Sequence, residues 1–593
     1  MLTRRHFLTL ASRGVGFAIV SHGLMGCAST QSSDSNQTSV PVPVKFEHGV
    51  ASGDPTQDAV ILWTRVSPVD RSFNKKLSVA WEVSTDKDFQ QLVTNGETLI
   101  GSETDYTVKI DAVGLTAGTT YYYRFTSGNA QSDIGKTKTL PSGSVESVKL
   151  AVFSCSNFPA GFFNVYDLAT KESNLDAVLH LGDYIYEYGR DGYATENAAR
   201  LGREVLPAGE TITLTDYRTR YAQYRSDESL QKLHQQAPFI CVWDDHEICN
   251  DTYLGGAQNH SEDEGSFEER KLAALQAYFE WMPIRPIVED NNEIINRAFS
   301  FGDMVDLYML DTRVVGRDKQ LEYSDYTDEA TGSFDGDRFK QDVSAVDRTL
   351  LGLEQLNWLK SSLKSSEGTW QVLGQQVLMG RMLFPAAIVT QKLSTPEYAE
   401  LSQLALLGQK VKANDPDLKP AEIEFFKANN ARLTDEVIQL LQLPNIPYNL
   451  DAWDGYAAER EAILGAAKYF KKNMVVLAGD THNAWANDIK DYKGDTVAVE
   501  FATPGVSSPG LESYLNLSKD DIQPTEAGIV QLIEGLQYMN ASDRGFLTVT
   551  FTRDKVTPHW HFVDTILSRS YSELTARAQI AESKVGEPGI KLV

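Results

Sequence analysis

The feature that most constrains the fold is a series of apolar runs, from about residue 148 onward, that end in polar clusters. Examples are KLAVFSC, AVLHLGD, FICVWDD and MVVLAGD, and helical stretches such as FEERKLAALQAYFEWM separate several of them. Buried strands that alternate with helices are typical of an α/β layered domain, in which ligands gather at the carboxyl ends of the strands. We therefore expect an α/β domain over residues 148–565, with a helical, polar insertion at about 385–450.

A different pattern precedes this region. Residues 45–140 contain short β-branched or aromatic runs separated by turns, among them AVILWTRV, KLSVAWEVS and TYYYRFTSG. This pattern predicts a small all-β sandwich of the fibronectin or immunoglobulin type. At the other end, GFLTVTFTRDKVTPHWHFVD predicts a late hairpin, and we expect the tail over 566–593 to begin as a helix and end loosely.

The N-terminus predicts export. Arg4 and Arg5 precede an apolar stretch that is too short to span a membrane, which is typical of a twin-arginine signal peptide over residues 1–26. LMGC then resembles a lipoprotein cleavage box ending at Cys27, the expected site of lipidation; the alternative is an ordinary cleaved signal. Residues 27–44 would be a flexible tether. The twin-arginine machinery would deliver the chain to the periplasm or the cell envelope as a lipoprotein, or to the exterior.

The net charge limits the kinds of molecule that the protein can bind. The chain has 81 acidic and 55 basic residues, and loss of the signal with its three arginines takes the net charge from -26 to -29. A surface of this sign argues against a stable nucleic-acid complex, and we expect a monomer.

If Cys27 is lipidated, three cysteines remain, so at least one is not in an intramolecular disulfide. Cys155 is a candidate free thiolate.

Four strand ends carry groups that could bind metal ions. Each group alone has an ordinary structural explanation, but four together in one domain indicate a metal site. They are Cys155 and Asn157 in FSCSN, Asp183 and Tyr186 in GDYIYEYG, Asp244, Asp245, His246 and Glu247 in VWDDHEICND, and Asp480 and His482 in VLAGDTHNAW.

The residue types indicate which ions. A carboxylate such as Asp183 can bridge two cations about 3.5–4 Å apart, as in two-metal hydrolysis. The thiolate of Cys155 and the phenolate of Tyr186 would stabilise ferric iron, and the remaining oxygen donors suit Ca²⁺ better than Zn²⁺. A zinc cage built from histidines is disfavoured, because the chain has only ten histidines and two lie in the signal.

These motifs, together with DYRTRYAQYR, WQVLGQQ and DAWDGY, resemble the PhoD-type alkaline phosphatase and phosphodiesterase family of the calcineurin-like metallophosphoesterase superfamily. The resemblance spans roughly 45–565 and implies that residues 148–565 form a metallophosphoesterase catalytic domain, an α/β (α+β layered) sandwich with an iron–calcium (Fe³⁺, Ca²⁺) centre. It places Asp183 as the bridging ligand and Asp245 at the Asn of the usual Asn-His-Glu motif, and it assigns His246 to the phosphoryl group. By the same resemblance the iron ligands are Cys155, Tyr186 and His482, the calcium-side ligand is Asp480, and Asn157, Gln375 and Gln376 are candidates for the rest.

The expected function is hydrolysis of phosphate monoesters, diesters or both by a metal-activated water, with His246 donating to the departing oxygen. Arg218, Arg220 and Arg225 could neutralise phosphate charge, but for at least two of them we favour the solvated face of a helix. One alternative is a non-catalytic calcium-binding surface lipoprotein or adhesin. A second alternative, an exported oxidoreductase, lacks a dinucleotide-binding or haem-attachment motif.

Overall fold

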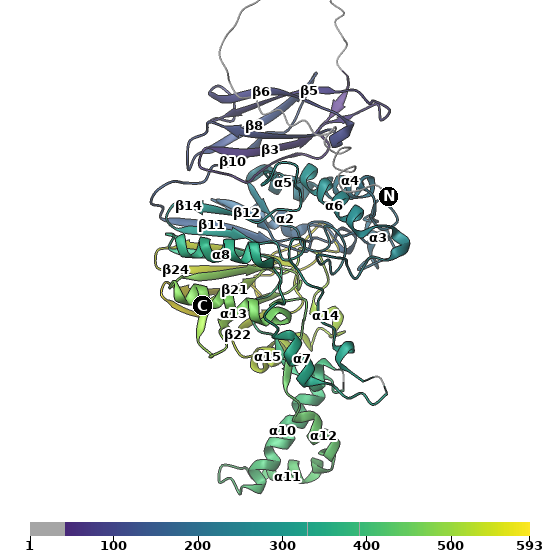
Figure 1. Ribbon diagram of the computed structural model, residues 1–593, viewed down its shortest axis with the longest axis vertical. Helices are drawn as coiled ribbons and strands as arrows, with labels where there is room; N and C mark the ends of the chain where they lie inside the picture. The colour runs from purple at the N-terminus through teal and green to yellow at the C-terminus, as the bar shows by residue number, and fades with distance from the viewer. Residues whose placement is uncertain (1–41, 329, 391) are drawn as a thin grey trace, which may run out of the picture.

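The structure is a computed structural model that describes residues 42–328, 330–390 and 392–593 (Figure 1). The predicted signal peptide, Cys27 and most of the predicted tether lie outside the described residues. Within those ranges, no helix combines the length and the apolar character needed to cross a membrane.

The N-terminal region is a β-sandwich, at the top of Figure 1. One sheet contains β5 (Leu77–Ser84), β6 (Leu92–Ile100), β8 (Thr120–Ser127) and β10 (Gly135–Lys138), and it faces β2 (Val50–Gly53), β3 (Ala59–Arg65) and β7 (Thr107–Val113). The sequence of strand β8, TYYYRFTS, explains why the two sheets face each other. Its residues Tyr121, Tyr123 and Phe125 alternate with more exposed residues and fill the core between the sheets.

The sandwich shares a sheet with the α/β domain. Strand β2 lies beside β13 (Phe239–Cys241) in a ten-stranded sheet with the order β26-β25-β24-β23-β11-β12-β13-β2-β3-β7. Its centre is parallel and consists of β11 (Ser147–Phe153), β12 (Ala177–His180) and β13. The apolar runs predicted from sequence thus form adjacent buried strands, whose carboxyl ends lie at one edge.

A second, seven-stranded sheet packs against the first. Its order is β14 (Arg297–Phe301), β15 (Val305–Met309), β16 (Trp370–Gly374), β19 (Met474–Ala478), β21 (Thr496–Ala502), β20 (Ala484–Lys490) and β22 (Leu536–Asn540). Side chains from both sheets share one core, among them Val152, Leu179, Val475 and Phe501. Helices α2 (Asn164–Ala169), α4 (Leu214–Tyr224), α5 (Glu228–Gln236) and α6 (Phe267–Trp281) lie on the side of the first sheet, and α8 (Gly352–Ser365) and α13 (Ala457–Tyr469) on the side of the second (Figure 1).

The C-terminal tail differs from the expected helix. It forms β25 (Gln579–Lys584) and β26 (Glu587–Leu592), which extend the first sheet beyond β24 (Lys555–Phe562). A two-residue turn of Val585 and Gly586, with Gly586 at φ 76°, joins the two strands. A short turn containing glycine is a hairpin signal, and pairing with the edge of β24 satisfies backbone groups that a helix would leave exposed there.

The expected insertion is a helical arm that projects from the base of the molecule in Figure 1. It consists of α9 (Ala386–Val389), α10 (Thr395–Lys412), α11 (Pro420–Asn429) and α12 (Asp435–Leu441). Strands β17 (Leu383–Pro385) and β18 (Asn445–Pro447) pair antiparallel at its base, so the chain enters and leaves the arm at one point.

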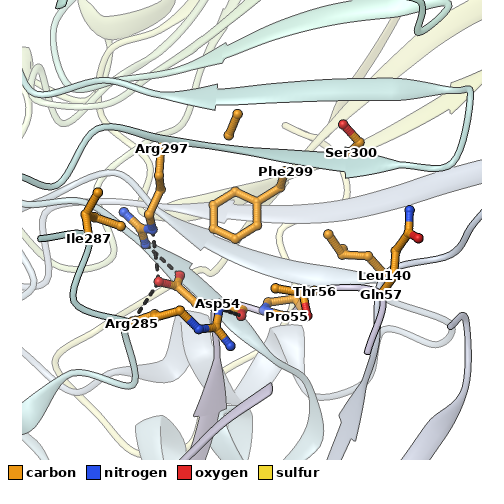
Figure 2. A pocket seen from close by; sticks show the side chains of 11 residues that line it. Asp54, Pro55, Thr56, Gln57, Leu140, Arg285, Ile287, Arg297, Phe299 and Ser300 are labelled. Atoms are coloured by element: carbon orange, nitrogen blue, oxygen red, sulfur yellow. Dashed lines mark hydrogen bonds and ion pairs between the residues drawn. The ribbon is translucent and has the colours of Figure 1, made fainter. Parts of the chain in front are cut away.

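One buried and one partly exposed ion pair connect the sandwich to the α/β domain. Asp54 accepts hydrogen bonds from the guanidinium of Arg297 at 2.7 and 3.0 Å and from the backbone nitrogen of Arg285 at 2.8 Å, as Figure 2 shows. The guanidinium of Arg285 pairs with Asp111 at 2.7 Å. These arginines line a pocket at the junction, but each is already paired with a carboxylate, so the pocket has the character of a domain contact rather than of an anion site.

Candidate metal centre

The carboxyl ends of strands from both sheets converge on one cluster of donor atoms. Cys155, Asp183 and His482 each place one possible ligand atom within 4.8 Å of the others, and so do Asp183, Asp245 and His246. Cys155 follows β11, Asp183 follows β12, Asp245 and His246 follow β13, and His482 follows β19. Asp183 belongs to both groups, which is the arrangement that a bridging carboxylate requires.

The backbone is strained where the predicted ligands lie. Cys155, Asp183, Asp480 and His482 all adopt left-handed conformations, with φ of 61°, 55°, 63° and 62°. Residues other than glycine adopt this conformation rarely and at a cost, and such strain gathers at functional sites. At all four positions it turns the chain sharply as a strand ends.

The glycine before Asp183 permits a close approach of two strand ends. Gly182 has a φ of 105°, and a Cβ added there would lie 2.3 Å from the Cβ of Asp244. Only glycine allows the loops after β12 and β13 to lie this close. Steric crowding thus explains why a glycine precedes Asp183 in the sequence.

Tyr186 connects the two sides of the cluster. Its hydroxyl donates to Oδ2 of Asp183 at 2.9 Å, lies 3.2 Å from Nε2 of His482, and accepts from Ser508 at 2.7 Å. Nδ1 of His482 lies 2.6 Å from the carbonyl oxygen of Pro509, so Nδ1 carries the proton and Nε2 presents a lone pair to the cluster. Burial lowers the pKa of His482 to about 3, which keeps the ring neutral.

The acidic groups of the cluster are buried and incompletely satisfied. Oδ1 of Asp183, Oδ2 of Asp244 and Oδ1 of Asn157 are buried and have no hydrogen-bond partner among the residues that the structure describes. Burial raises the pKa of Cys155, Asp183 and Tyr186 well above their usual ranges. A cation would satisfy the unpaired oxygens and favour loss of these protons, because its field stabilises the charged forms.

Glu247 holds the loops rather than facing the cluster. Its carboxylate accepts hydrogen bonds from the backbone nitrogens of Asp183 at 3.0 Å, Tyr184 at 2.5 Å and Asp244 at 2.7 Å. One buried side chain therefore fixes both strand ends. This role explains the glutamate of the DDHE cluster without a metal.

His246 has a buried carboxylate partner that sequence reasoning missed. Oε2 of Glu187 lies 2.7 Å from Nδ1 of His246, while Oε1 accepts from Asn250 and Asn259, both at 2.8 Å. Burial disfavours the imidazolium, but the charges of Glu187, Asp245 and Asp183 outweigh it and hold the pKa of His246 well above its usual range. Glu187 stands within the quoted GDYIYEYG, next to Tyr186, which is the only sequence signal for it.

Asp480 lies apart from both ligand groups. It is not in either cluster of groups within 4.8 Å, and one of its oxygens lies 3.5 Å from the guanidinium of Arg313. Arg313 is fully buried, contacts Asp244 at 2.5 Å and pairs with both oxygens of Asp451 at 2.8 Å. Sequence reasoning missed Arg313 and Asp451, although Arg313 ends the apolar segment LYMLDTR and Asp451 begins the motif DAWDGY.

The three amide candidates separate clearly. The side-chain oxygen of Gln375 accepts from Trp453 at 3.1 Å, and that of Gln376 accepts from Thr312 at 2.7 Å. Both glutamines are therefore structural, and neither presents a free oxygen. Asn157 alone keeps an unpaired buried oxygen and remains a candidate ligand.

The expectation for the arginines of DYRTRYAQYR is wrong. Arg220 and Arg225 are fully buried, not on a solvated face, and Arg218 pairs with Glu280 at 2.6 Å. Arg220 donates to backbone carbonyls, including that of Tyr186, and Arg225 stacks over Trp63 with 4.4 Å to the ring centroid. The long side chains of all three arginines thus make contacts within the fold: an ion pair, hydrogen bonds to loop carbonyls and stacking on an aromatic ring.

The comparisons with known proteins establish the family. Residues 150–560 match the PhoD-like phosphatase family, and residues 29–141 match the N-terminal domain of PhoD-like phosphatases. The chain belongs to the PhoD-like phosphatase family. It is 31% identical to alkaline phosphatase D of Bacillus subtilis (strain 168) over 570 residues, covering 94% of this chain and 82% of that protein.

A solved structure, titled "Structure of PhoD", superimposes with a TM-score of 0.72 at 29% identity, covering 94% of this chain and 93% of that one. As a member of the PhoD-like phosphatases, the chain is a phosphatase hydrolase with an α/β domain behind an all-β domain. The match spans every strand end described above, so a non-catalytic surface adhesin is disfavoured. All three cysteines in the described residues are free and buried.

Proposed function

We propose that this chain is an exported phosphoesterase that hydrolyses phosphate esters with water at a centre of ferric iron and calcium. The observation that carries the proposal is the place of Asp183 in two groups of possible ligands that share its carboxylate. The family membership supports the reaction class, and the geometry supports two adjacent ion positions.

The donor sets on the two sides of Asp183 differ in chemistry. Cys155, Tyr186 and the lone pair of His482 would hold the iron, because thiolate and phenolate offset a high positive charge. Asp245 and the unpaired oxygens of Asp244 and Asn157 would hold calcium, which takes oxygen ligands. Asp480 would complete the calcium side through a modest shift away from Arg313.

When bound, the ions would polarise the phosphoryl oxygens and lower the pKa of a bound water. His246 lies beside Asp183 and Asp245, and its Nδ1 is engaged by Glu187, so its Nε2 is the free nitrogen of the ring. In the protonated state that its carboxylate neighbours favour, Nε2 can donate a hydrogen bond to the phosphoryl group and a proton to the departing oxygen. Glu187 orients the ring for this transfer.

We further propose export by the twin-arginine pathway, with residues 1–26 removed and Cys27 lipidated. The motifs at the N-terminus support this, and so does a fold whose ligands come from both sheets, because such a site forms only after the domain has folded. A pathway that carries folded proteins would allow the metal to be loaded first.

The decisive experiment combines metal analysis with a substrate panel on one preparation. We expect iron and calcium in the purified protein, and turnover of phosphate monoesters, diesters or both at alkaline pH. The Asp183→Asn variant should lose activity and both metals while keeping its circular dichroism spectrum. Full turnover by Asp183→Asn, or an active wild type that a calcium chelator leaves unaffected, would contradict the centre proposed here.

A further inference from the structure

A ladder of tyrosine rings leads from the candidate centre to the surface. Tyr193 lies 6.1 Å from Tyr186 in a stacked arrangement and 6.2 Å from the ring of His482, measured between ring centroids. Tyr188 lies 6.0 Å from Tyr193 and 5.4 Å from the ring of His246. Two partly buried tyrosines thus border the side of the cluster where His246 and His482 lie.

Two more tyrosines stand further out. The hydroxyl of Tyr514, in α14 (Leu511–Tyr514), donates to the hydroxyl of Tyr193 at 3.2 Å, and the ring is 62% exposed. Tyr448 follows β18 at the base of the helical arm, packs 5.4 Å from the ring of Phe384 and is 42% exposed. Tyr448 stands three residues before Asp451, whose carboxylate pairs with Arg313 next to Asp480, so its segment passes beside the site.

Single exposed tyrosines are ordinary, but these four come from three segments, namely the loop after β12, the base of the arm and α14, and they lie beside one site. Each presents a flat π face at low conformational cost, and the hydroxyl of Tyr193 is fixed by Tyr514 and by the carbonyl of Pro509 at 3.3 Å. Arg544, a cation next to α14, is already paired with Glu512 of that helix at 2.6 Å. The rim therefore suits a planar ring better than additional phosphate.

We propose that Tyr188, Tyr193, Tyr448 and Tyr514, here called the tyrosine rim, form a subsite that stacks an aromatic ring carried by the leaving group of the ester. The ring could belong to an aryl group or to a nucleobase, and both offer the same π face. This inference rests on the proposed function, since it assigns a substrate class to that site.

The test compares ring-bearing and ring-free esters in Tyr514→Ala. We expect the ratio of kcat/KM for phenyl phosphate to that for glycerol 1-phosphate to fall about 5- to 100-fold, mainly through KM, as the loss of one stacking contact predicts. Adenosine 5′-monophosphate provides the nucleobase arm: a larger fall for this ester than for phenyl phosphate assigns the rim to nucleobases, and the reverse assigns it to aryl groups. The Tyr514→Trp variant should restore the ratio, because it restores a ring.

Tyr492→Ala is the matched control. Tyr492 is 69% exposed, but it follows β20 at the end of the strand opposite to His482. We expect the wild-type ratio in this variant. An equal loss on all three esters in Tyr514→Ala, or no rescue by tryptophan, would overturn the proposal.

Binding of phosphonates, which carry no ester to hydrolyse, tests the subsite independently of the proposed reaction. In calorimetry of the metal-loaded protein, phenylphosphonate should bind more tightly than methylphosphonate, and Tyr514→Ala should remove the difference. If the wild type hydrolyses no ester but keeps this preference, the proposed function fails and the subsite stands. If both phosphonates bind the wild type equally while esters are hydrolysed, the subsite fails and the function stands.

Discussion

Oε2 of Glu187 and Nδ1 of His246 are 2.7 Å apart, and both side chains are buried. The pair fixes the imidazole so that its other nitrogen is free, and it favours the protonated ring. In the proposed mechanism Glu187 acts on the phosphoryl group only through His246, so it would be a positioning residue. Its effect should therefore appear in the pH dependence of the reaction as well as in its rate.

We predict that Glu187→Gln lowers kcat about 10- to 100-fold, less than the full contribution of a general acid. The glutamine keeps the shape but removes a charge that raises the pKa of His246. The protonated ring should then be lost at lower pH, so the alkaline limb of the kcat/KM profile should move to lower pH. Glu204→Gln, at a surface position with a 47% exposed side chain, is the control. A lower rate with an unmoved alkaline limb would argue against this role.

Much of the site could be predicted from sequence, because each ligand candidate stands directly after a buried strand in a short motif. Cys155, Asp183, Asp245 and His482 needed no knowledge of pairing beyond the rule that parallel strands share a carboxyl edge. The resemblance implies a sandwich, but the assignment of each strand to one of its two sheets could not be predicted from the strand sequences. Strand β19 pairs with β16 and β21 instead of β13, and the sequence of a strand does not show which strand it pairs with.

The residues that were missed or misjudged have a common property. Arg313 pairs with Asp451, 138 positions away, and Glu187 pairs with His246, 59 positions away. Such partners depend on tertiary proximity, and a charged residue in a sequence is by default expected at the surface. For the same reason the sequence favours a solvated face for at least two of the three arginines in DYRTRYAQYR, whereas the fold buries Arg220 and Arg225.

Cys155→Ala should remove iron before it removes the fold. The thiol is fully buried, and the substitution deletes a single sulfur atom in a site that already holds Tyr186 and His482. We expect iron content and the visible Tyr-to-ferric absorption to fall at least several-fold, with an unchanged far-ultraviolet circular dichroism spectrum. Cys241→Ala, which removes a buried free thiol in β13, should keep both iron and colour. Equal iron in the two variants would refute an iron ligand at position 155.

Gly182→Ala should destabilise the protein and inactivate it together. The new Cβ would meet Asp244 at 2.3 Å in a backbone at φ 105°, so strain and overpacking add, at about 2–4 kcal/mol in unfolding free energy. Gly114→Ala separates the two effects, because Gly114 has a φ of 80° and its added Cβ would meet nothing within 4 Å. Urea unfolding should show a clearly smaller loss for Gly114→Ala. Equal losses would mean that the close approach of the strand ends is unimportant.

His48 lies at the junction of the two domains, against Arg225 and Trp281, and should make stability depend on pH. His48 is 6% exposed, its ring lies edge-on to Trp281 at 5.2 Å, and burial, helped by the charges of Arg65 and Arg225, lowers its pKa to about 3. The folded state thus keeps this histidine neutral, while the unfolded chain binds a proton below about pH 6.5. The stability from His48 is fully present above that pH and is lost as the pH falls toward 3, by up to about 1.4 kcal/mol per pH unit.

His48→Gln removes this proton uptake, so its unfolding free energy should fall less steeply than that of the wild type between pH 6.5 and 4.5. Urea unfolding at pH 7.5, 6.5, 5.5 and 4.5 measures the difference in slope, to which the other titrating groups contribute equally in both proteins. Parallel curves would show that His48 is protonated in the folded state and that the junction is more open to water than its contacts indicate.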